Sequence, residues 1–189
     1  MPDDTPIAFT AQGRPIFDNS PSVVVVAAPV TLGGRRGLLG IRRGKGQGAG
    51  LLGLPGGFQM RGLSWQANGA KEVLEETGHA VPAGLRLRGL VTDEYDHNVV
   101  LALSGAEAVR VTAETDGEAM EILALGPEHF DPEDWAFPIH LAHAILSWDQ
   151  LFDAGMFPPR TILDTPEEAR DVIARFLEFR AEAEPGFDV

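Results

Sequence analysis

The sequence predicts an α/β domain, in which strands and helices alternate and pack in layers. Apolar runs bounded by glycine and polar residues, such as Val23–Val30, predict buried strands. Segments that carry helix-capping residues at their ends, such as 64–78 and 165–183, predict helices. With 189 residues, of which 44% are hydrophobic, the chain is long enough to bury a core of its own.

Six segments are predicted as strands from their apolar pattern and length. They are Val23–Val30, Gly37–Arg43, Leu51–Leu54, Leu85–Thr92, Asn98–Leu103 and Ala119–Leu125. Residues 44–50, Gly-Lys-Gly-Gln-Gly-Ala-Gly, predict a flexible loop that is not a Walker A motif, since no Ser or Thr follows the lysine at the required spacing. Pro55-Gly56-Gly57 predicts a glycine turn where the backbone can approach a ligand closely.

The helix predicted at 64–78 has a defined start and stop, because Ser64 suits the N-cap position and Gly78 the left-handed position after a helix. Its expected core-facing stripe consists of Ala70, Val73, Leu74 and Thr77. This stripe predicts that the opposite, acidic face points outward.

Two further helices are predicted near the C-terminus, at Phe137–Phe152 and Pro166–Ala183. Thr165 and Glu168 stand in a capping-box relation at the start of the second. The histidines show no metal-ligand spacing, and His140 and His143 are expected at the helix surface or the core edge.

Three parts of the chain are expected: an N-terminal polar segment at 1–20, a main folded domain at 21–154 and a C-terminal helical extension at 155–189. The extension is expected to pack on the domain, and a homodimer interface is the alternative.

Composition limits the classes of function. The absence of cysteine excludes disulfides, thiolate zinc sites and cysteine nucleophiles. The acidic start, Met1-Pro2-Asp3-Asp4, lacks the basic region of a signal peptide, and Val23–Val30 is too short to span a bilayer. We therefore expect a cytoplasmic protein without a membrane partner. The net charge of −13 argues against non-specific binding to nucleic acid.

Positive charge gathers in the first part of the chain. Residues 1–71 hold 8 Lys and Arg against 3 Asp and Glu, although the whole chain is acidic. Arg42, Arg43 and Lys45 lie beside the glycine loop, where they are candidates to bind the phosphates of a small anionic substrate. The alternative for each is a solvated loop charge.

Glu72, Glu75 and Glu76 share one face of the predicted helix, roughly 5–6 Å apart at Cβ. Like charges this close repel by about 3 kcal/mol per pair at an effective dielectric near 20. Carboxylate oxygens are the ligands that Mg²⁺ and Mn²⁺ prefer, so the cluster indicates a metal-binding helix. The alternative is a solvated acidic surface.

The stretch from Gly57 to His79 resembles the signature box of Nudix hydrolases, G-x5-E-x7-R-E-U-x-E-E-x-G-U, where U is a bulky aliphatic residue. The residues at matching positions are Gly57, Glu72, Val73, Glu75, Glu76 and Gly78. Three positions depart from the pattern: Leu63 replaces the first Glu, Lys71 replaces Arg, and His79 replaces an aliphatic residue. The resemblance extends loosely over residues 20–147 and implies an α/β/α sandwich with a mixed central sheet.

The resemblance also implies a reaction, the hydrolysis of a nucleoside diphosphate linked to another moiety, with Mg²⁺ or Mn²⁺ as cofactor. By resemblance, the metal ligands are the side chains of Glu72, Glu75 and Glu76 and the carbonyl oxygen of Gly57. Lys71 would orient a glutamate of the helix.

Two further roles follow from the same resemblance. The general base is either a glutamate of the box or one from a later loop, for which Glu118 is the first candidate. Tyr95 lies where relatives that act on dinucleoside polyphosphates often place a tyrosine, and it would stack on a base. The implied substrate is a nucleotide derivative such as ADP-ribose, a dinucleotide, a dinucleoside polyphosphate or a nucleotide sugar.

The departures from the pattern keep a second function open. Leu63 cannot bind a cation or a water molecule, and Lys71 lacks the planar fork that holds a carboxylate in two places. Losses of this kind typically cost 10–100-fold in metal affinity or activity. A Nudix-fold module that binds a nucleotide with little or no turnover is therefore the alternative to a hydrolase.

Overall fold

The structure of the protein, a computed structural model, describes residues 6–16, 19–81, 84–152, 154–158 and 161–183. Its elements in chain order are β1 (Ala8–Phe9), β2 (Pro15–Ile16), β3 (Ser22–Ala27), β4 (Pro29–Leu32), β5 (Arg35–Arg43), β6 (Leu52–Gly53), β7 (Gly56–Phe58), α1 (Trp65–Thr77), β8 (His79–Ala80), β9 (Arg86–Thr92), β10 (Asn98–Leu103), β11 (Val109–Arg110), β12 (Ala119–Leu125), the short 3₁₀ helices η1 (Pro127–His129) and η2 (Pro132–Asp134), α2 (Pro138–Phe152) and α3 (Pro166–Ala183).

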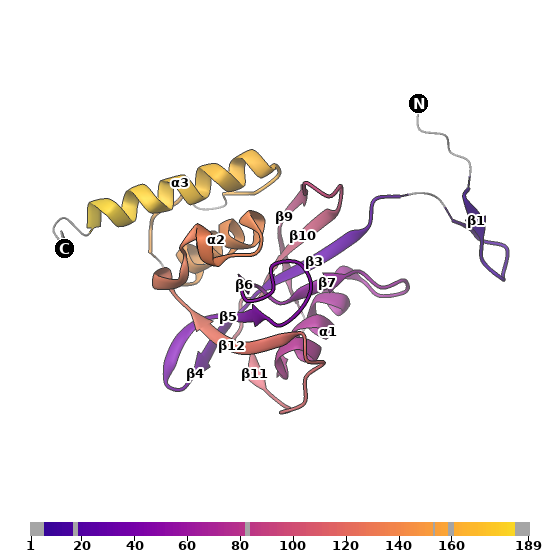
Figure 1. Cartoon of the computed structure of the whole chain (residues 1–189), viewed down its shortest axis with the longest axis horizontal. Helices are drawn as coiled ribbons and strands as arrows, with labels where there is room; N and C mark the ends of the chain where they lie inside the picture. The colour runs from indigo at the N-terminus through magenta and orange to yellow at the C-terminus, as the bar shows by residue number, and fades with distance from the viewer. Residues whose placement is uncertain (1–5, 17–18, 82–83, 153, 159–160, 184–189) are drawn as a thin grey trace.

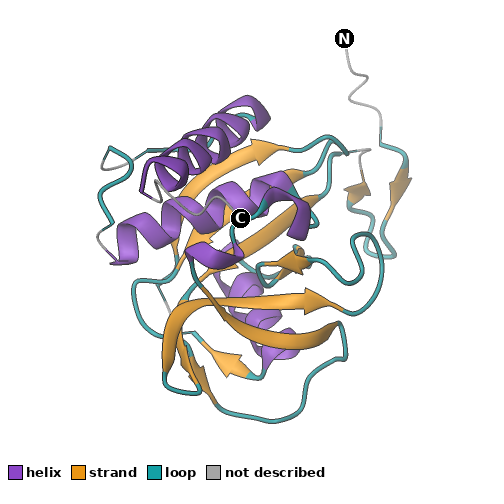
Figure 2. Cartoon of the chain, turned by 60° about the vertical axis from the view of Figure 1, so that its left-hand side comes forward, coloured by secondary structure: helices purple, strands orange, loops and turns teal. Residues whose placement is uncertain are grey.

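A mixed four-stranded sheet, in the order β7-β3-β10-β9, forms the middle layer. β10 runs parallel to β3, whereas the other neighbours are antiparallel. Alternate side chains of β3 enter two cores, Val25 joining the core of α2 and α3, and Val24 and Val26 the core that includes Val73 of α1. Figure 2 shows two helices on one side of the strands and the third on the other. The predicted α/β/α architecture with a mixed sheet is confirmed.

A second sheet, in the order β12-β5-β4, lies beside the first and is antiparallel. The prediction of one strand at Val23–Val30 is wrong, because the chain passes from one sheet to the other at Ala28. β3 pairs with β10 and β7, whereas β4 pairs with β5. Both halves of the apolar run are buried, so hydropathy does not reveal the change of sheet, and Pro29 at the start of β4 is the one local signal.

Residues 56–58 form the edge strand β7, which corrects the prediction of a glycine turn there. β7 pairs antiparallel with β3, so that Gly56 lies opposite Val25 and Gly57 opposite Val24. Three residues with two glycines carry too little side-chain pattern to predict a strand. Because β7 also contacts α1, the backbone of Gly57 is brought to the acidic helix.

The two C-terminal helices lie together on one face of the mixed sheet (Figure 1). The predicted capping box at the start of α3 is present: Glu168 N–H donates to Thr165 Oγ1 at 3.2 Å, and Thr165 N–H donates to Glu168 Oε2 at 3.1 Å. The expectation of a surface or core-edge position is wrong for His143, which is completely buried and hydrogen-bonded to the carbonyl of Ala102 at 2.9 Å.

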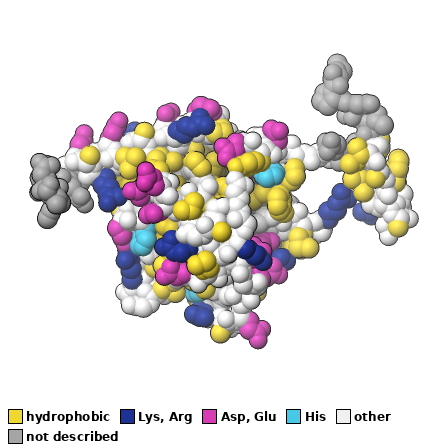
Figure 3. Space-filling view, viewed as in Figure 1, with side chains coloured by type: hydrophobic (Ala, Val, Ile, Leu, Met, Phe, Trp, Pro, Cys, Tyr) yellow, Lys and Arg dark blue, Asp and Glu magenta, His cyan; other side chains and the backbone are white. Residues whose placement is uncertain are grey.

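The small hairpin of β1 and β2 projects away from the rest of the chain (Figure 1). Ile7 and Phe9 are more than three-fifths exposed there, and Figure 3 shows hydrophobic side chains on this projection. Among the residues that the structure describes, no helix combines the length and the apolar character needed to cross a bilayer.

Candidate active site

Helix α1 begins and ends at the predicted capping residues. The Ser64 hydroxyl accepts a hydrogen bond from Ala67 N–H at 3.2 Å. Gly78 adopts a left-handed conformation with φ of 70°, and its N–H donates to the Leu74 carbonyl at 2.9 Å. These two caps fix the register of the helix and therefore the direction of its three glutamates.

The three glutamates differ in burial. Glu76 is 2% exposed, the side chain of Glu72 is 13% exposed, and that of Glu75 is 44% exposed. The predicted outward acidic face is therefore wrong for Glu76, and the predicted core position is wrong for Leu74, which is 38% exposed. The cause is that β7 covers the helix from the side of Glu72 and Glu76, which hydropathy alone does not indicate.

The two buried glutamates contact the backbone of β7. Gly56 N–H donates to Glu76 Oε2 at 3.2 Å. A Cβ atom on Gly57 would lie only 2.6 Å from Glu72 Oε2, so any side chain at this position would displace the Glu72 carboxylate. Glycine at position 57 thus allows a carboxylate to lie directly against a strand.

Burial and neighbouring negative charge perturb both carboxyl groups. Burial raises the pKa of Glu76 to about 8; the Gly56 hydrogen bond opposes this, and the charges of Glu72, Asp116 and Glu118 add to it. Burial also raises the pKa of Glu72, against the lowering effect of Lys71. A positive charge among these groups would favour their ionised forms, so the electrostatics of the site fit a cation.

Lys71 lies among the same carboxylates. Its Nζ is 2.5 Å from Glu75 Oε2 and 3.4 Å from Glu72 Oε1. The hydrogen bond to Glu75 is the main reason that the pKa of Lys71 is raised. Lys71 therefore keeps its charge and pairs with Glu75, the most exposed of the three helix carboxylates.

The residues fit a hard divalent cation in chemistry and partly in geometry. Glu72 and Glu76 supply carboxylate oxygens beside the backbone of Gly57, a donor set that suits Mg²⁺ or Mn²⁺. Among the described residues, however, no group of three His, Asp or Glu side chains is gathered closely enough to hold a metal ion. The pairing of Glu75 with Lys71 is consistent with this finding.

A cavity of about 430 Å³ opens beside β7, within the range usual for small-molecule sites. Its walls come from β3, β5, β7, the β9–β10 turn and the starts of α2 and α3. The predicted site residues that line it are Arg43, Gly57, Tyr95 and Glu118. The predicted site residues of α1 do not line the cavity but lie behind β7. They are Lys71, Glu72, Glu75 and Glu76.

Arg42 and Arg43 point to opposite sides of β5, as neighbours on a strand do. Arg43 lines the cavity, with its Nε donating to the Gln47 carbonyl at 2.9 Å and its guanidinium 5.2 Å from the centre of the Phe137 ring. Arg42 binds Glu121 at 3.1 Å and the carbonyl of Gly50 at 3.0 Å, and it is not among the described lining residues.

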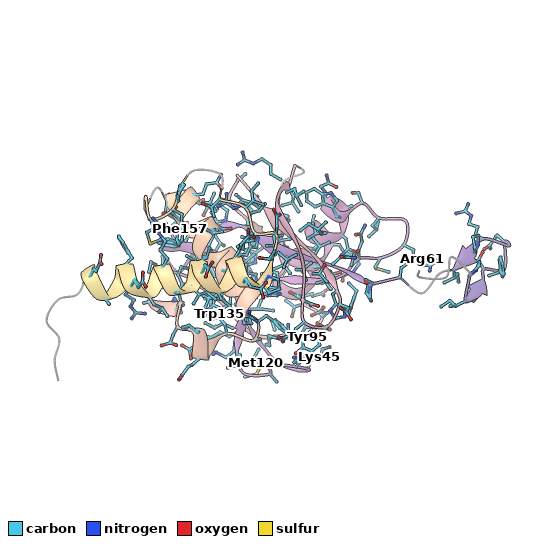
Figure 4. All side chains as sticks on the ribbon, turned by 90° about the horizontal axis from the view of Figure 1, so that it is seen from above. Lys45, Arg61, Tyr95, Met120, Trp135 and Phe157 are labelled. Carbon is cyan, nitrogen blue, oxygen red and sulfur yellow. The ribbon has the colours of Figure 1, made fainter. Side chains whose placement is uncertain are left out.

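Tyr95 and Glu118 meet the glycine loop at the cavity. The Gln47 side chain donates a hydrogen bond to the Tyr95 hydroxyl, and Lys45 pairs with Glu118 at 3.1 Å. Figure 4 shows Tyr95 and Lys45 near each other and Arg61 far from both. The loop predicted as flexible thus makes side-chain contacts with two predicted site residues.

The β9–β10 turn presents Tyr95 and His97 to the cavity, and Asp93 organises this turn. Asp93 Oδ1 accepts hydrogen bonds from the N–H groups of Tyr95 at 2.9 Å and His97 at 2.8 Å. Its Oδ2 lies 3.1 Å from His97 Nδ1. The ring of His97 stands edge-on to Phe58 at 5.3 Å, so an aromatic surface borders the cavity.

Sequence reasoning missed several residues of the site. Asn68 is fully buried, accepts a hydrogen bond from Met60 N–H at 2.9 Å and donates to Glu72 at 3.4 Å. Its position four residues before Glu72 was the available signal. Asp116, whose charge acts on Glu72 and Glu76, and Arg170 of α3 carried no local signal, because the tertiary fold brings them to the site.

No protein-family model and no curated protein sequence matches the chain. Solved structures do resemble it. A Nudix hydrolase from Nitrosomonas europaea superposes with a TM-score of 0.61 at 16% identity, covering 83% of this chain and 84% of that one. A MutT/nudix family protein from Enterococcus faecalis gives 0.57 at 19% identity, covering 86% and 76%.

An ADP-ribose pyrophosphatase from Streptococcus suis gives a TM-score of 0.51 at 17% identity, covering 78% of this chain and 98% of that one. At these identities the likeness concerns the fold. The chain therefore has the fold of Nudix hydrolases, as the resemblance of residues 57–79 implied.

Proposed function

We propose that the chain is a divalent-metal-dependent pyrophosphohydrolase that cleaves a nucleoside diphosphate linked to another moiety. The observation that carries this proposal is the contact of Glu72 and Glu76 with the backbone of β7, a strand whose residues also line the cavity. The substrate class is a nucleotide derivative: ADP-ribose, a dinucleotide, a dinucleoside polyphosphate or a nucleotide sugar. The ADP-ribose pyrophosphatase among the similar folds supports this class.

The proposed metal ligands are the carboxylates of Glu72, Glu75 and Glu76 and the carbonyl oxygen of Gly57. Glu75 would have to leave Lys71 to take part. A bound Mg²⁺ or Mn²⁺ would neutralise the pyrophosphate and lower the pKa of a water molecule. Lys71 is the proposed positioning residue for Glu75.

The residues of the cavity supply the remaining roles in the proposal. Glu118 is the first candidate for the general base, since it lines the cavity, where its carboxylate pairs with Lys45 at 3.1 Å. Arg43 would contact phosphate oxygens, and Tyr95 would stack on the base. Arg42, which is paired with Glu121, is the weakest of the proposed substrate-binding residues.

The test is a release assay for phosphate and nucleoside monophosphate with ADP-ribose, NADH, dinucleoside polyphosphates and nucleotide sugars, in Mg²⁺ and then in Mn²⁺. The proposal expects metal-dependent turnover of at least one substrate, abolished by chelation and by Glu76→Gln. Metal-independent turnover, or turnover unchanged in Glu76→Gln, would contradict it.

The second candidate function is a nucleotide-binding module with little or no turnover. It is favoured by the 2.5 Å contact between Lys71 and Glu75, which holds one proposed ligand, and by Leu63 at a position where a carboxylate is expected. If nucleotides raise the melting temperature of the protein while none is hydrolysed, this second function replaces the first.

A further inference from the structure

The C-terminal helix α3 forms part of the cavity wall. Pro166, Glu167 and Arg170, all from its first two turns, line the cavity together with residues of β7 and of the β9–β10 turn. The helix lies outside the 21–154 segment expected to form the domain. A segment expected only to pack on the domain thus contacts the site itself.

The start of α3 is held firmly in this place. Leu163 forms a parallel bridge with Gly89 of β9, which ties the preceding segment to the edge of the mixed sheet. The capping box of Thr165 and Glu168 then fixes the first turn. The inner face of the helix is buried against the core through Ala169, Val172, Ile173 and Phe176. Arg170 is therefore presented by a rigid element, which suits a recognition role.

The two guanidinium groups at the cavity differ in how they are held. Arg43 donates to the Gln47 carbonyl and lies over the Phe137 ring. Arg170 pairs with Glu167 at 3.2 Å, with side chains 67% and 74% exposed. No other hydrogen bond or ion pair of Arg170 occurs among the described residues. An exposed pair of this kind contributes little to stability, so a ligand can readily compete for the guanidinium.

We propose that Arg170 binds a phosphate oxygen of the ligand and is a specificity-determining residue of the cavity. This inference rests on the proposed function in one respect, that the ligand is a nucleotide. The planar guanidinium fork matches the geometry of a phosphate group, and apart from Arg43 the other charged and aromatic side chains of the lining are carboxylates and rings. The carboxylate of Glu167 competes with the phosphate for the guanidinium of Arg170, and its negative charge repels the phosphate.

The experiment measures binding without turnover. The probes are adenosine and α,β-methylene-ADP, in which a methylene group replaces the anhydride oxygen so that the probe is not hydrolysed. Both are titrated by calorimetry in Mg²⁺ into the full chain and into three variants: Arg170→Ala, Glu167→Gln and Arg175→Ala. Tyr95 is the only tyrosine of the chain, so fluorotyrosine labelling gives a single ¹⁹F signal that reports occupancy of the cavity.

Arg175→Ala is the matched control. Arg175 lies on the same helix, but its guanidinium is 5.4 Å from the centre of the Phe157 ring. Phe157 lies far from Tyr95 and Lys45 in Figure 4. This variant therefore removes an arginine from α3 without changing the cavity, and it should bind both probes as the wild type does.

The two cavity variants are expected to change the affinity for the diphosphate probe in opposite directions. Arg170→Ala lowers the affinity for the diphosphate probe by roughly 5- to 20-fold, the range for one charge-assisted hydrogen bond in a partly exposed setting, and leaves adenosine binding unchanged. Glu167→Gln raises the affinity for the diphosphate probe about twofold, since it removes a competing charge. A structural role for the pair would instead weaken the binding of both probes in both variants.

Equal affinity of wild type and Arg170→Ala for the diphosphate probe would overturn the inference, as would a wild type that binds this probe no better than adenosine. The proposed function fails on another readout, the absence of metal-dependent hydrolysis. A chain that binds through Arg170 but hydrolyses nothing therefore keeps this inference and loses the hydrolase. If the chain hydrolyses nucleotides and Arg170 is dispensable for binding, the proposed function stands and this inference fails.

Discussion

The two walls of the cavity differ in how the chain builds them. One side, which we call the box wall, consists of the lining strand β7 together with helix α1, which packs on β7 without lining the cavity, and it comes from a single stretch, residues 56–78. The other, the distal wall, consists of the turn at 93–97 and the starts of α2 and α3, which are far apart in sequence. Local spacing can predict the box wall, whereas the distal wall exists only once the chain has folded.

The walls also differ in chemistry. The box wall holds buried carboxylates against a strand backbone, a setting that suits a cation. The distal wall is aromatic and partly exposed, with Tyr95 46% exposed, and it carries Arg170. We therefore expect changes in the box wall to affect turnover and metal binding, and changes in the distal wall to affect affinity for the ligand.

The largest effect is expected from Glu76→Gln. Glu76 is buried against β7, whereas Glu75 is paired with Lys71 at the surface. We expect Glu76→Gln to lower kcat by more than roughly 100-fold, since the loss of an outer partner of a metal ligand alone costs 10–100-fold. Glu75→Gln should lower it less. Steady-state kinetics in Mg²⁺ checks this, and a larger loss in Glu75→Gln would contradict the ranking by burial.

Gly57→Ala should weaken divalent-cation binding about tenfold, the size of effect usual for a disturbed outer partner. The reason is that the new Cβ atom would lie 2.6 Å from Glu72 Oε2 and displace that carboxylate. Gly53→Ala is the control, because its Cβ atom would meet nothing closer than 3.7 Å. Mn²⁺ affinities of the two variants should differ, and equal affinities would mean that Glu72 does not hold the cation.

Tyr95→Ala should raise KM by roughly tenfold with little change in kcat, since stacking on a base contributes about 1–3 kcal/mol. Tyr95→Phe keeps the ring and loses only the hydrogen bond from Gln47, so its KM should stay close to that of the wild type. A fall in kcat with unchanged KM would place Tyr95 among the groups that act in the chemical step.

The smallest effect is a pH dependence of stability at His143, away from both walls. Burial, together with the smaller effect of the Arg88 charge, lowers the pKa of His143 to about 4, against the opposing effect of the hydrogen bond to Ala102. Below the unfolded pKa of about 6.5, the unfolded chain takes up a proton at this residue that the folded chain does not. Stability should therefore fall as the pH falls from 6.5 towards 4, by on the order of 1 kcal/mol at pH 5.5.

Urea denaturation at pH 7.5 and pH 5.5 measures this loss, and His143→Gln is the comparison, because glutamine can still donate to the Ala102 carbonyl but does not titrate. The variant should lose less stability between the two pH values. An equal loss in the two proteins would assign the acid sensitivity to other groups.

The sequence predicted the strands and helices whose hydrophobic pattern is local and strong. The helix at 166–183 and the strands at 98–103 and 119–125 have their predicted bounds. The break at Ala28 and the strand β7 were not predictable in this way, because both are set by pairing with distant strands. The fully buried His143 was missed because its partner, Ala102, comes from another element.

In the candidate site, too, the local features could be predicted from the sequence and the tertiary ones could not. The spacing of Glu72, Glu75 and Glu76 was readable from the sequence, but their unequal burial was not, since it depends on where β7 lies. From the sequence, Arg42 and Arg43 were equally good candidates for substrate binding. In the structure, side chains alternate between the two faces of β5, so that only Arg43 lines the cavity. The residues that α3 brings to the cavity could not be predicted from the sequence, because they reach it only through tertiary packing.

The central claim is that the box wall binds a divalent cation beside a nucleotide cavity. The most direct measurement is a titration of the protein with Mn²⁺, followed by the electron paramagnetic resonance signal of the free ion, in wild type and in Glu76→Gln. The account predicts saturable binding by the wild type and weakening by at least roughly tenfold in the variant. Equal Mn²⁺ binding by the two proteins, or none by the wild type, would contradict it.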